Sequence, residues 1–112
     1  MNILHEEYKL ILERKKDCFN EIEGEKSYTK YLFREGINKI LKKVGEESAE
    51  LIIAAKDASS GAGAENYAEL VVEETADLFY HVLVTLAELD IPLSDVEAMF
   101  EKRFAKTGNM KG

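Results

Sequence analysis

Residues 75–87 read TADLFYHVLVTLA, and this run constrains the architecture more than any other part of the chain. Asp77 is its only acidic residue, and apolar side chains would fall on nearly every side of a helix formed by it. Such a helix must be covered by other helices, so we expect it to be central. We predict that it spans residues 64–89, because Asp90 and Pro92 follow directly.

A second long helix is predicted over residues 37–58, before the small-residue segment SSGAG at 59–63. At 100° per residue its apolar side chains share one broad stripe, which we expect to be its core face. The stripe consists of Ile37, Ile40, Leu41, Val44, Leu51, Ile52 and Ala55. The short connection predicts that the two long helices pack antiparallel.

Three shorter helices are expected around this pair. Apolar spacing predicts one over residues 2–16, and Ser27 is a candidate N-cap for a short helix, SYTKYLFR, that runs into Gly36. Ser94 and Glu97 have the spacing of a capping box and predict a last helix over about 94–105. No alternating strand pattern is present. The prediction is one all-α domain over residues 1–112, a helical bundle with two long antiparallel central helices.

Bulk composition excludes several classes of protein. The 112 residues carry a formal net charge of −7 and no basic stripe, which argues against nucleic-acid binding. No run approaches the ~18 apolar residues of a membrane span. The only cysteine, Cys18, has no partner for an internal disulfide, so a cytoplasmic protein is expected.

Carboxylates occupy unusual places on both long helices. Glu47 lies at the edge of the apolar stripe with Glu50 one turn away, and Glu74 precedes Asp77 by three residues. A carboxylate at the edge of a core is costly unless it is paired or binds a metal. If the two pairs face each other, they form an all-oxygen site suited to Mg²⁺ or Mn²⁺. Glu46 and Glu73 are possible further ligands. The alternative is that these acids are merely solvated and the chain is a non-catalytic helical dimerisation module.

These motifs resemble a known superfamily. EESAE at 46–50 followed by ETAD at 74–77 is similar to the EExxE…ExxD signature of MazG-like all-α nucleotide pyrophosphohydrolases. The runs SYT (27–29), KKVGEE (42–47), AAK (54–56) and DLFYH (77–81) resemble, in this order, the phosphoribosyl-ATP pyrophosphohydrolase family over residues 2–104. The segment SSGAGAEN at 59–66 resembles an insertion, and the tail after Phe104 lacks the basic ending common in the family.

The resemblance implies a bundle completed by homodimerisation and a Mg²⁺-dependent hydrolase, with Mn²⁺ possible at an all-oxygen site. Apolar residues on more than one face of the two long helices separately predict a homo-oligomer, either a dimer or a larger assembly. Its reaction would convert phosphoribosyl-ATP to phosphoribosyl-AMP and pyrophosphate in histidine biosynthesis. Glu47, Glu50, Glu74 and Asp77 would hold the metal, and Glu46 or Glu47 would orient or deprotonate the attacking water. A house-cleaning enzyme that acts on free (deoxy)nucleoside triphosphates is the alternative within the superfamily.

Other residues are candidate substrate ligands. Lys43 lies one turn before Glu46 and Glu47 and could reach phosphate oxygens, although an ion pair along the helix would also explain it. Lys42 and Lys56 are weaker phosphate candidates. Tyr28 could stack on a base or pack in the core, and His81 could contact substrate or be a hydrogen-bonded structural residue.

Overall fold

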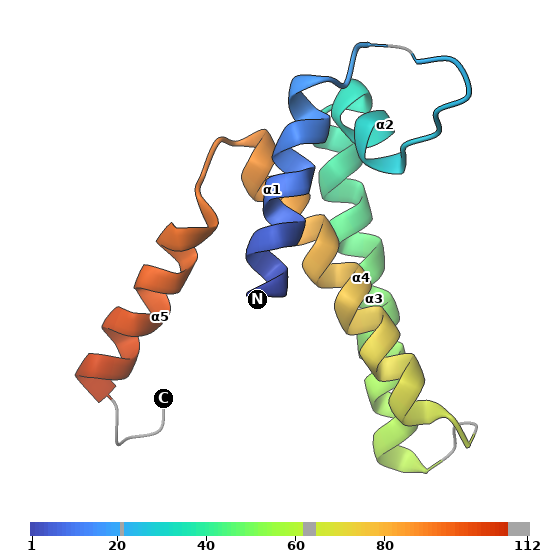
Figure 1. Cartoon of the computed structure of the whole chain (residues 1–112). Coiled ribbons are helices and arrows are strands. Elements are labelled where there is room, and N and C mark those ends of the chain that lie inside the picture. Colours follow the sequence, from blue (N-terminus) through green and yellow to red (C-terminus); the bar gives the residue numbers. More distant parts are fainter. Residues whose placement is uncertain (21, 62–64, 108–112) are drawn as a thin grey trace.

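The computed structural model describes residues 1–20, 22–61 and 65–107, which form five helices and their connections (Figure 1). The helices are α1 (Ile3–Lys16), α2 (Tyr28–Glu35), α3 (Ile37–Ser60), α4 (Tyr67–Glu88) and α5 (Leu93–Thr107). No strand occurs among these described residues, so the predicted all-α class is confirmed.

Helices α3 and α4 lie side by side and antiparallel, and their contact is the most extensive between any two of the described helices (Figure 1). Helix α1 packs on α4 and on α2, while α2 packs on α3. Four helices and the start of the fifth therefore contribute to one core. Its buried apolar residues are Tyr8, Ile11, Cys18, Leu32, Phe33, Ile40, Leu83, Val84, Ala87 and Leu93.

Helix boundaries follow local capping chemistry. The Ser27 side chain accepts a hydrogen bond from the Lys30 N–H, which confirms the predicted N-cap of α2. Gly36 (φ 91°) separates α2 from α3, and Gly61 (φ 71°) ends α3 in the left-handed conformation that glycine adopts without steric cost. Helix α3 runs two residues further than predicted, and α4 begins at Tyr67. The predicted start at residue 64 lies outside the described residues, as do 62–64 of the apparent insertion and 108–112 of the tail.

The predicted capping box at Ser94 is wrong. Helix α5 begins at Leu93, so Ser94 lies inside its first turn. The Glu97 carboxylate does not fold back on the helix end. Its Oε1 lies 2.7 Å from Nε2 of His5 on α1, a partner 92 residues away that local spacing does not reveal.

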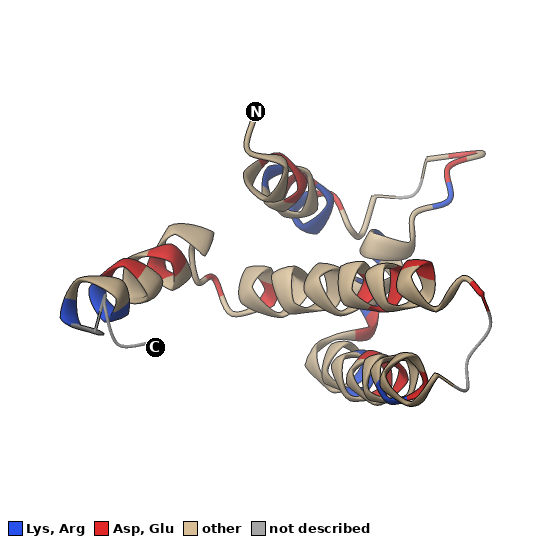
Figure 2. Cartoon of the chain, turned by 90° about the horizontal axis from the view of Figure 1, so that it is seen from below, with Lys and Arg blue, Asp and Glu red and all other residues tan. Residues whose placement is uncertain are grey.

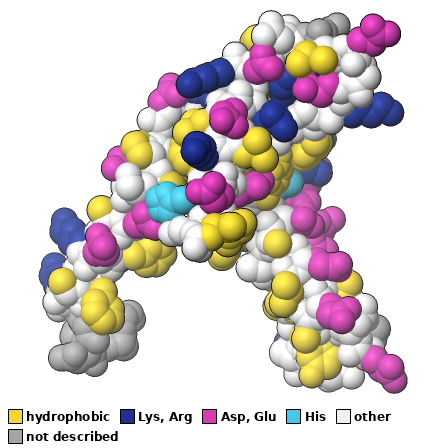
Figure 3. All heavy atoms as spheres, in the orientation of Figure 1, with side chains coloured by type: hydrophobic (Ala, Val, Ile, Leu, Met, Phe, Trp, Pro, Cys, Tyr) yellow, Lys and Arg dark blue, Asp and Glu magenta, His cyan; other side chains and the backbone are white. Residues whose placement is uncertain are grey.

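The expectations that α4 is covered by other helices and that the apolar stripe of α3 is its core face are only partly correct within a single chain. Ile40 and Val84 are fully buried, but Leu41 and Phe79 are exposed and Ile52 is 67% exposed. Helix α5 packs on the rest near its start and then extends away from the α3–α4 pair (Figure 1). Hydrophobic side chains are visible on the surface of both α5 and the α3–α4 pair in the space-filling view (Figure 3). Within the described residues, no helix has the length and apolarity of a membrane span.

Candidate metal and substrate site

Three carboxylates converge where α3 and α4 pack together. Glu47 and Glu50 come from α3 and Glu74 comes from α4, and one carboxylate oxygen of each lies within 4.8 Å of the others. Glu47 is only 7% exposed, Glu74 is partly buried and Glu50 faces solvent. Figure 2 shows the acidic residues of α4 gathered mainly in its N-terminal half, which is the half that carries Glu74 and Asp77. The site is therefore buried on one side and open on the other.

The electrostatics of this cluster are unfavourable for the carboxylates alone. Burial raises the pKa of Glu47, and the neighbouring Glu50 and Asp77 raise it further. Burial also raises the pKa of Glu74, again with Glu50 and Asp77 adding to the shift. Lys43 opposes the shift at Glu47, but its Nζ lies 4.0 Å from Oε2 of that residue. A bound cation would stabilise the ionised cluster more than this lysine does.

The donor set and its spacing fit Mg²⁺. At about 2.1 Å from an octahedral Mg²⁺, adjacent ligands lie roughly 3.0 Å apart and opposite ligands about 4.2 Å apart, so oxygens within 4.8 Å of one another could share one ion after their side chains rotate toward it. Three carboxylates also leave coordination positions for water and phosphate oxygens. Asp77 is not part of this group of three, although its charge acts on Glu47 and Glu74.

The two possible additional ligands lie outside the cluster as well. The Glu46 carboxylate is 3.2 Å from the Lys43 ammonium, and Glu73 is exposed. Glu46 is thus held beside the cluster by a lysine and is not part of the group of three.

A cavity of about 260 Å³ adjoins the cluster. It is lined by Tyr28, Tyr31, Lys39, Lys42, Lys43 and Glu46. Two predicted phosphate ligands, Lys42 and Lys43, are therefore brought together here. Lys56 is not part of this lining, because it lies thirteen positions after Lys43 on the same helix, a rise of about 20 Å. Lys39 was missed by the sequence analysis, although its spacing to Lys42 and Lys43 places all three near one face.

Tyr28 lines this cavity, and His81 is in contact with Tyr28. The Tyr28 hydroxyl is 2.9 Å from Nε2 of His81, and Nδ1 of His81 is 2.7 Å from the main-chain oxygen of Asp77. Burial raises the pKa of the Tyr28 phenol, Lys43 partly offsets this shift, and Glu47 adds to it. The charges of Lys43 and Glu47 therefore act on the Tyr28 hydroxyl.

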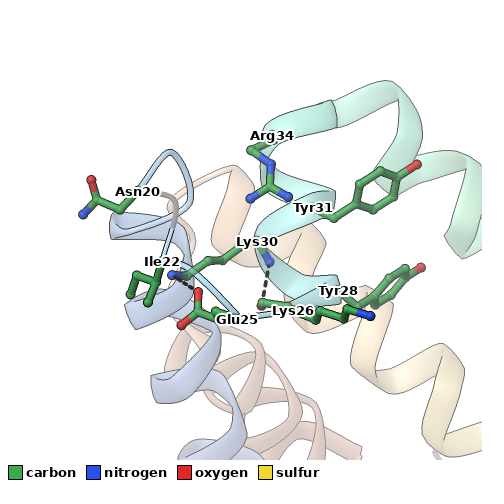
Figure 4. Close-up of a pocket in the computed structure, with 9 residues that line it drawn as sticks. Asn20, Ile22, Glu25, Lys26, Tyr28, Lys30, Tyr31 and Arg34 are labelled. Atoms are coloured by element: carbon green, nitrogen blue, oxygen red, sulfur yellow. Dashed lines mark hydrogen bonds and ion pairs between the residues drawn. The ribbon is translucent and has the colours of Figure 1, made fainter.

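A second cavity, of about 480 Å³, lies between α2 and the segment that precedes it (Figure 4). Tyr28 and Tyr31 belong to the linings of both cavities. In Figure 4 these rings project to one side of α2, whereas Lys30 and Glu25 lie on the other. Lys30 is nearly fully buried, and its Nζ lies 2.9 Å from Asp17 and 2.5 Å from Glu25. Two further cations, Lys26 and Arg34, also line this cavity.

The fold and the site define an all-α protein whose two antiparallel helices carry a carboxylate cluster beside a lysine-lined cavity. This arrangement suits a divalent cation and a phosphate-bearing ligand. The chain belongs to the phosphoribosyl-ATP pyrophosphohydrolase family, which matches residues 6–104.

Individual relatives agree with this assignment. The chain is 39% identical to a phosphoribosyl-ATP pyrophosphatase of Clostridium novyi, over 99% of this chain and 89% of the relative. It is 48% identical to a protein of the same name from Listeria welshimeri, over 95% of this chain and 86% of the relative. It is also 43% identical to the histidine biosynthesis bifunctional protein HisIE of Caldanaerobacter subterraneus, over 95% of this chain and 45% of that longer protein.

Proposed function

We propose that this protein is a Mg²⁺-dependent phosphoribosyl-ATP pyrophosphohydrolase of histidine biosynthesis. Its reaction is attack of water on the α–β phosphoanhydride of phosphoribosyl-ATP: a P–O bond to the water oxygen forms, the bridging P–O bond of the anhydride breaks, and phosphoribosyl-AMP and pyrophosphate are the two products. The observation that carries the proposal is the carboxylate cluster of Glu47, Glu50 and Glu74 beside the cavity that Lys42 and Lys43 line. Family membership selects the substrate.

Each group has a role in this reaction. Glu47, Glu50 and Glu74, with Asp77 one turn from Glu74, would hold Mg²⁺. When bound, the ion neutralises the triphosphate and polarises the reacting phosphorus. Lys42 and Lys43 bind phosphate oxygens from the adjoining cavity. Glu46 is the better candidate to orient and deprotonate the water, because it lies outside the group of three and its carboxylate is held by Lys43.

Phosphoribosyl-ATP differs from a free nucleoside triphosphate in its additional phosphorylated ribose. The cavity of about 480 Å³ in Figure 4 provides room for this group next to the lysine-lined cavity, because Tyr28 and Tyr31 line both. A guanidinium carries five N–H donors, and Arg34 uses one for the Cys18 carbonyl, which leaves donors for a phosphate. This second cavity favours phosphoribosyl-ATP over the house-cleaning alternative.

The test is pyrophosphate release from phosphoribosyl-ATP and from ATP, side by side and with Mg²⁺ present. We expect a much higher kcat/KM for phosphoribosyl-ATP, with phosphoribosyl-AMP as the second product. A preference for ATP or deoxynucleoside triphosphates would support the house-cleaning enzyme. No release from any nucleotide, together with no Mg²⁺ binding, would support the non-catalytic dimerisation module.

A homodimer, or a larger homo-oligomer, is the second part of the proposal. The radius of gyration is 16.7 Å, whereas a compact domain of 112 residues has about 13 Å. Ile52 on α3 and Val72 on α4 are exposed, as are Phe100 and Phe104 on the projecting α5. A second copy would cover these surfaces. The cytoplasmic location expected from the single cysteine also remains a proposal.

A further inference from the structure

Both ring nitrogens of His81 are engaged within the protein. Nδ1 lies 2.7 Å from the main-chain oxygen of Asp77, and a carbonyl oxygen accepts but never donates. Nδ1 of the neutral imidazole therefore carries the hydrogen, and Nε2 has a free lone pair. The Tyr28 hydroxyl, 2.9 Å from Nε2, must donate to it. The two contacts thus select one His81 tautomer and one direction for each hydrogen bond.

His81 and Tyr28 differ in their exposure to solvent, and this difference gives them separate roles. His81 is 6% exposed and packs edge-on against the rings of Tyr28 and Tyr80, with centroids 5.7 Å and 4.9 Å away. Tyr28 is 46% exposed and lines both cavities. A ligand in either cavity therefore meets Tyr28, and His81 lies behind it.

The direction of the hydrogen bond determines what Tyr28 offers a ligand. Because its only hydroxyl hydrogen goes to His81, the phenol oxygen presents lone pairs to the cavity. Such an oxygen accepts from a sugar hydroxyl and repels a phosphate oxygen, which is also an acceptor. The Lys43 ammonium, which acts on the Tyr28 pKa, is positioned to take the phosphates instead.

We propose that His81 is a positioning residue that fixes Tyr28 as a hydrogen-bond acceptor for a ribose hydroxyl of the substrate. The hydrogen bonds from Tyr28 to His81 and from His81 to the Asp77 carbonyl run in series. The helical turn that carries the Asp77 carboxylate therefore also sets the position of Tyr28. These hydrogen bonds therefore fix the position of the sugar relative to the phosphate-binding residues. This inference rests on the proposed nucleotide substrate.

The test is a double-mutant cycle on phosphoribosyl-ATP hydrolysis. Tyr28→Phe removes the hydroxyl, and His81→Asn keeps a donor for the Asp77 carbonyl but is too short to reach Tyr28. Each single variant should lower kcat/KM about tenfold, and the double variant should lose no more than either single one. His81→Gln, whose amide oxygen extends about as far as Nε2, should recover most of the loss. Tyr80→Phe is the matched control, because it removes a neighbouring hydroxyl that bonds Thr29, and it should stay near wild type.

Two results would overturn the inference. One is a multiplicative loss of about a hundredfold in the double variant, which would mean that the residues act independently. The other is a loss in His81→Asn that Tyr28→Phe does not share, which would mean that His81 acts on substrate directly. The His81 tautomer, read from ¹H–¹⁵N correlations of the imidazole, is a readout that does not need activity. Nδ1–H is expected, and Nε2–H would refute the link even if phosphoribosyl-ATP proved not to be the substrate.

Discussion

Mg²⁺ should raise the melting temperature of this protein through the carboxylate cluster. In the metal-free protein, Glu47, Glu50 and Glu74 hold their oxygens within 4.8 Å of one another, and burial adds to the cost of their charges. The unfolded chain separates them, so it binds Mg²⁺ far less well than the folded chain. Binding to the folded state alone stabilises it by RT ln(1 + [Mg²⁺]/Kd), which is about 2.7 kcal/mol at one hundred times Kd.

The expected shift follows from the size of the domain. At about 2.1 cal/mol/K of unfolding entropy per residue, 112 residues convert each kcal/mol into roughly 4 °C. Saturation to one hundred times Kd therefore predicts a rise of about 11 °C. The assay is calorimetry or circular dichroism at fixed protein concentration, with Mg²⁺ and with NaCl at matched ionic strength.

Sodium chloride separates coordination from screening. Monovalent salt weakens repulsion among the acids but does not bind them as ligands, so its effect should be small beside that of Mg²⁺. Glu50→Gln should lose most of the Mg²⁺-specific shift, while Glu101→Gln, an exposed change on α5, should keep it. Equal responses of the wild-type protein to Mg²⁺ and to matched NaCl would refute the reasoning.

Three further predictions follow from the same site and surface. Asp77→Asn and Glu50→Gln should each lower pyrophosphate release about a hundredfold or more while the circular dichroism spectrum stays unchanged, and near-wild-type turnover would remove that residue from the site. In the metal-free protein, the pKa values of Glu47 and Glu74 are raised, so protonation of these residues stabilises the folded state. This contribution to stability is fully present below the ordinary pKa of 4.5 and is lost as the pH rises through the raised pKa. As the pH is lowered from 7 to 5, the wild type should gain this contribution from Glu47 and the Glu47→Gln variant should not. The free energy of unfolding in urea should therefore change less favourably for Glu47→Gln than for the wild type, and identical pH profiles would contradict the raised pKa. Sedimentation at micromolar concentration should show a dimer or larger species, and a folded monomer would contradict the proposed assembly.

Much of the fold is predictable from local pattern. Helical periodicity and the capping chemistry of Ser27 identify the elements within a few residues. The convergence of Glu47, Glu50 and Glu74 was also predictable. A carboxylate at the edge of an apolar stripe is costly without a partner, and the short connection makes the two helices antiparallel. Periodicity could not show that Leu41 and Ile52 are exposed, since an apolar stripe does not distinguish the core of one chain from an interface.

Contacts between distant segments were beyond the sequence analysis. Lys15 of α1 donates to the Ala87 carbonyl at the end of α4, over 2.7 Å, and to the Asp90 carboxylate, over 2.8 Å. Its position among three basic residues at the end of α1 does not single it out. Lys30 is buried against Asp17 and Glu25, although a lysine at this position of a short helix would be assigned to the surface. Each of these pairings depends on how the helices pack, and local spacing carries no signal of it.

The central claim is that the carboxylate cluster between α3 and α4 supports Mg²⁺-assisted hydrolysis of phosphoribosyl-ATP. Its most direct test is the initial rate of pyrophosphate release from phosphoribosyl-ATP, titrated with Mg²⁺ in the wild type and in Glu74→Gln. The wild type should be inactive in EDTA and rise to a saturating rate with Mg²⁺, and Glu74→Gln should need far more Mg²⁺ or stay inactive. Full activity in EDTA, or the same Mg²⁺ dependence in both proteins, would contradict the claim.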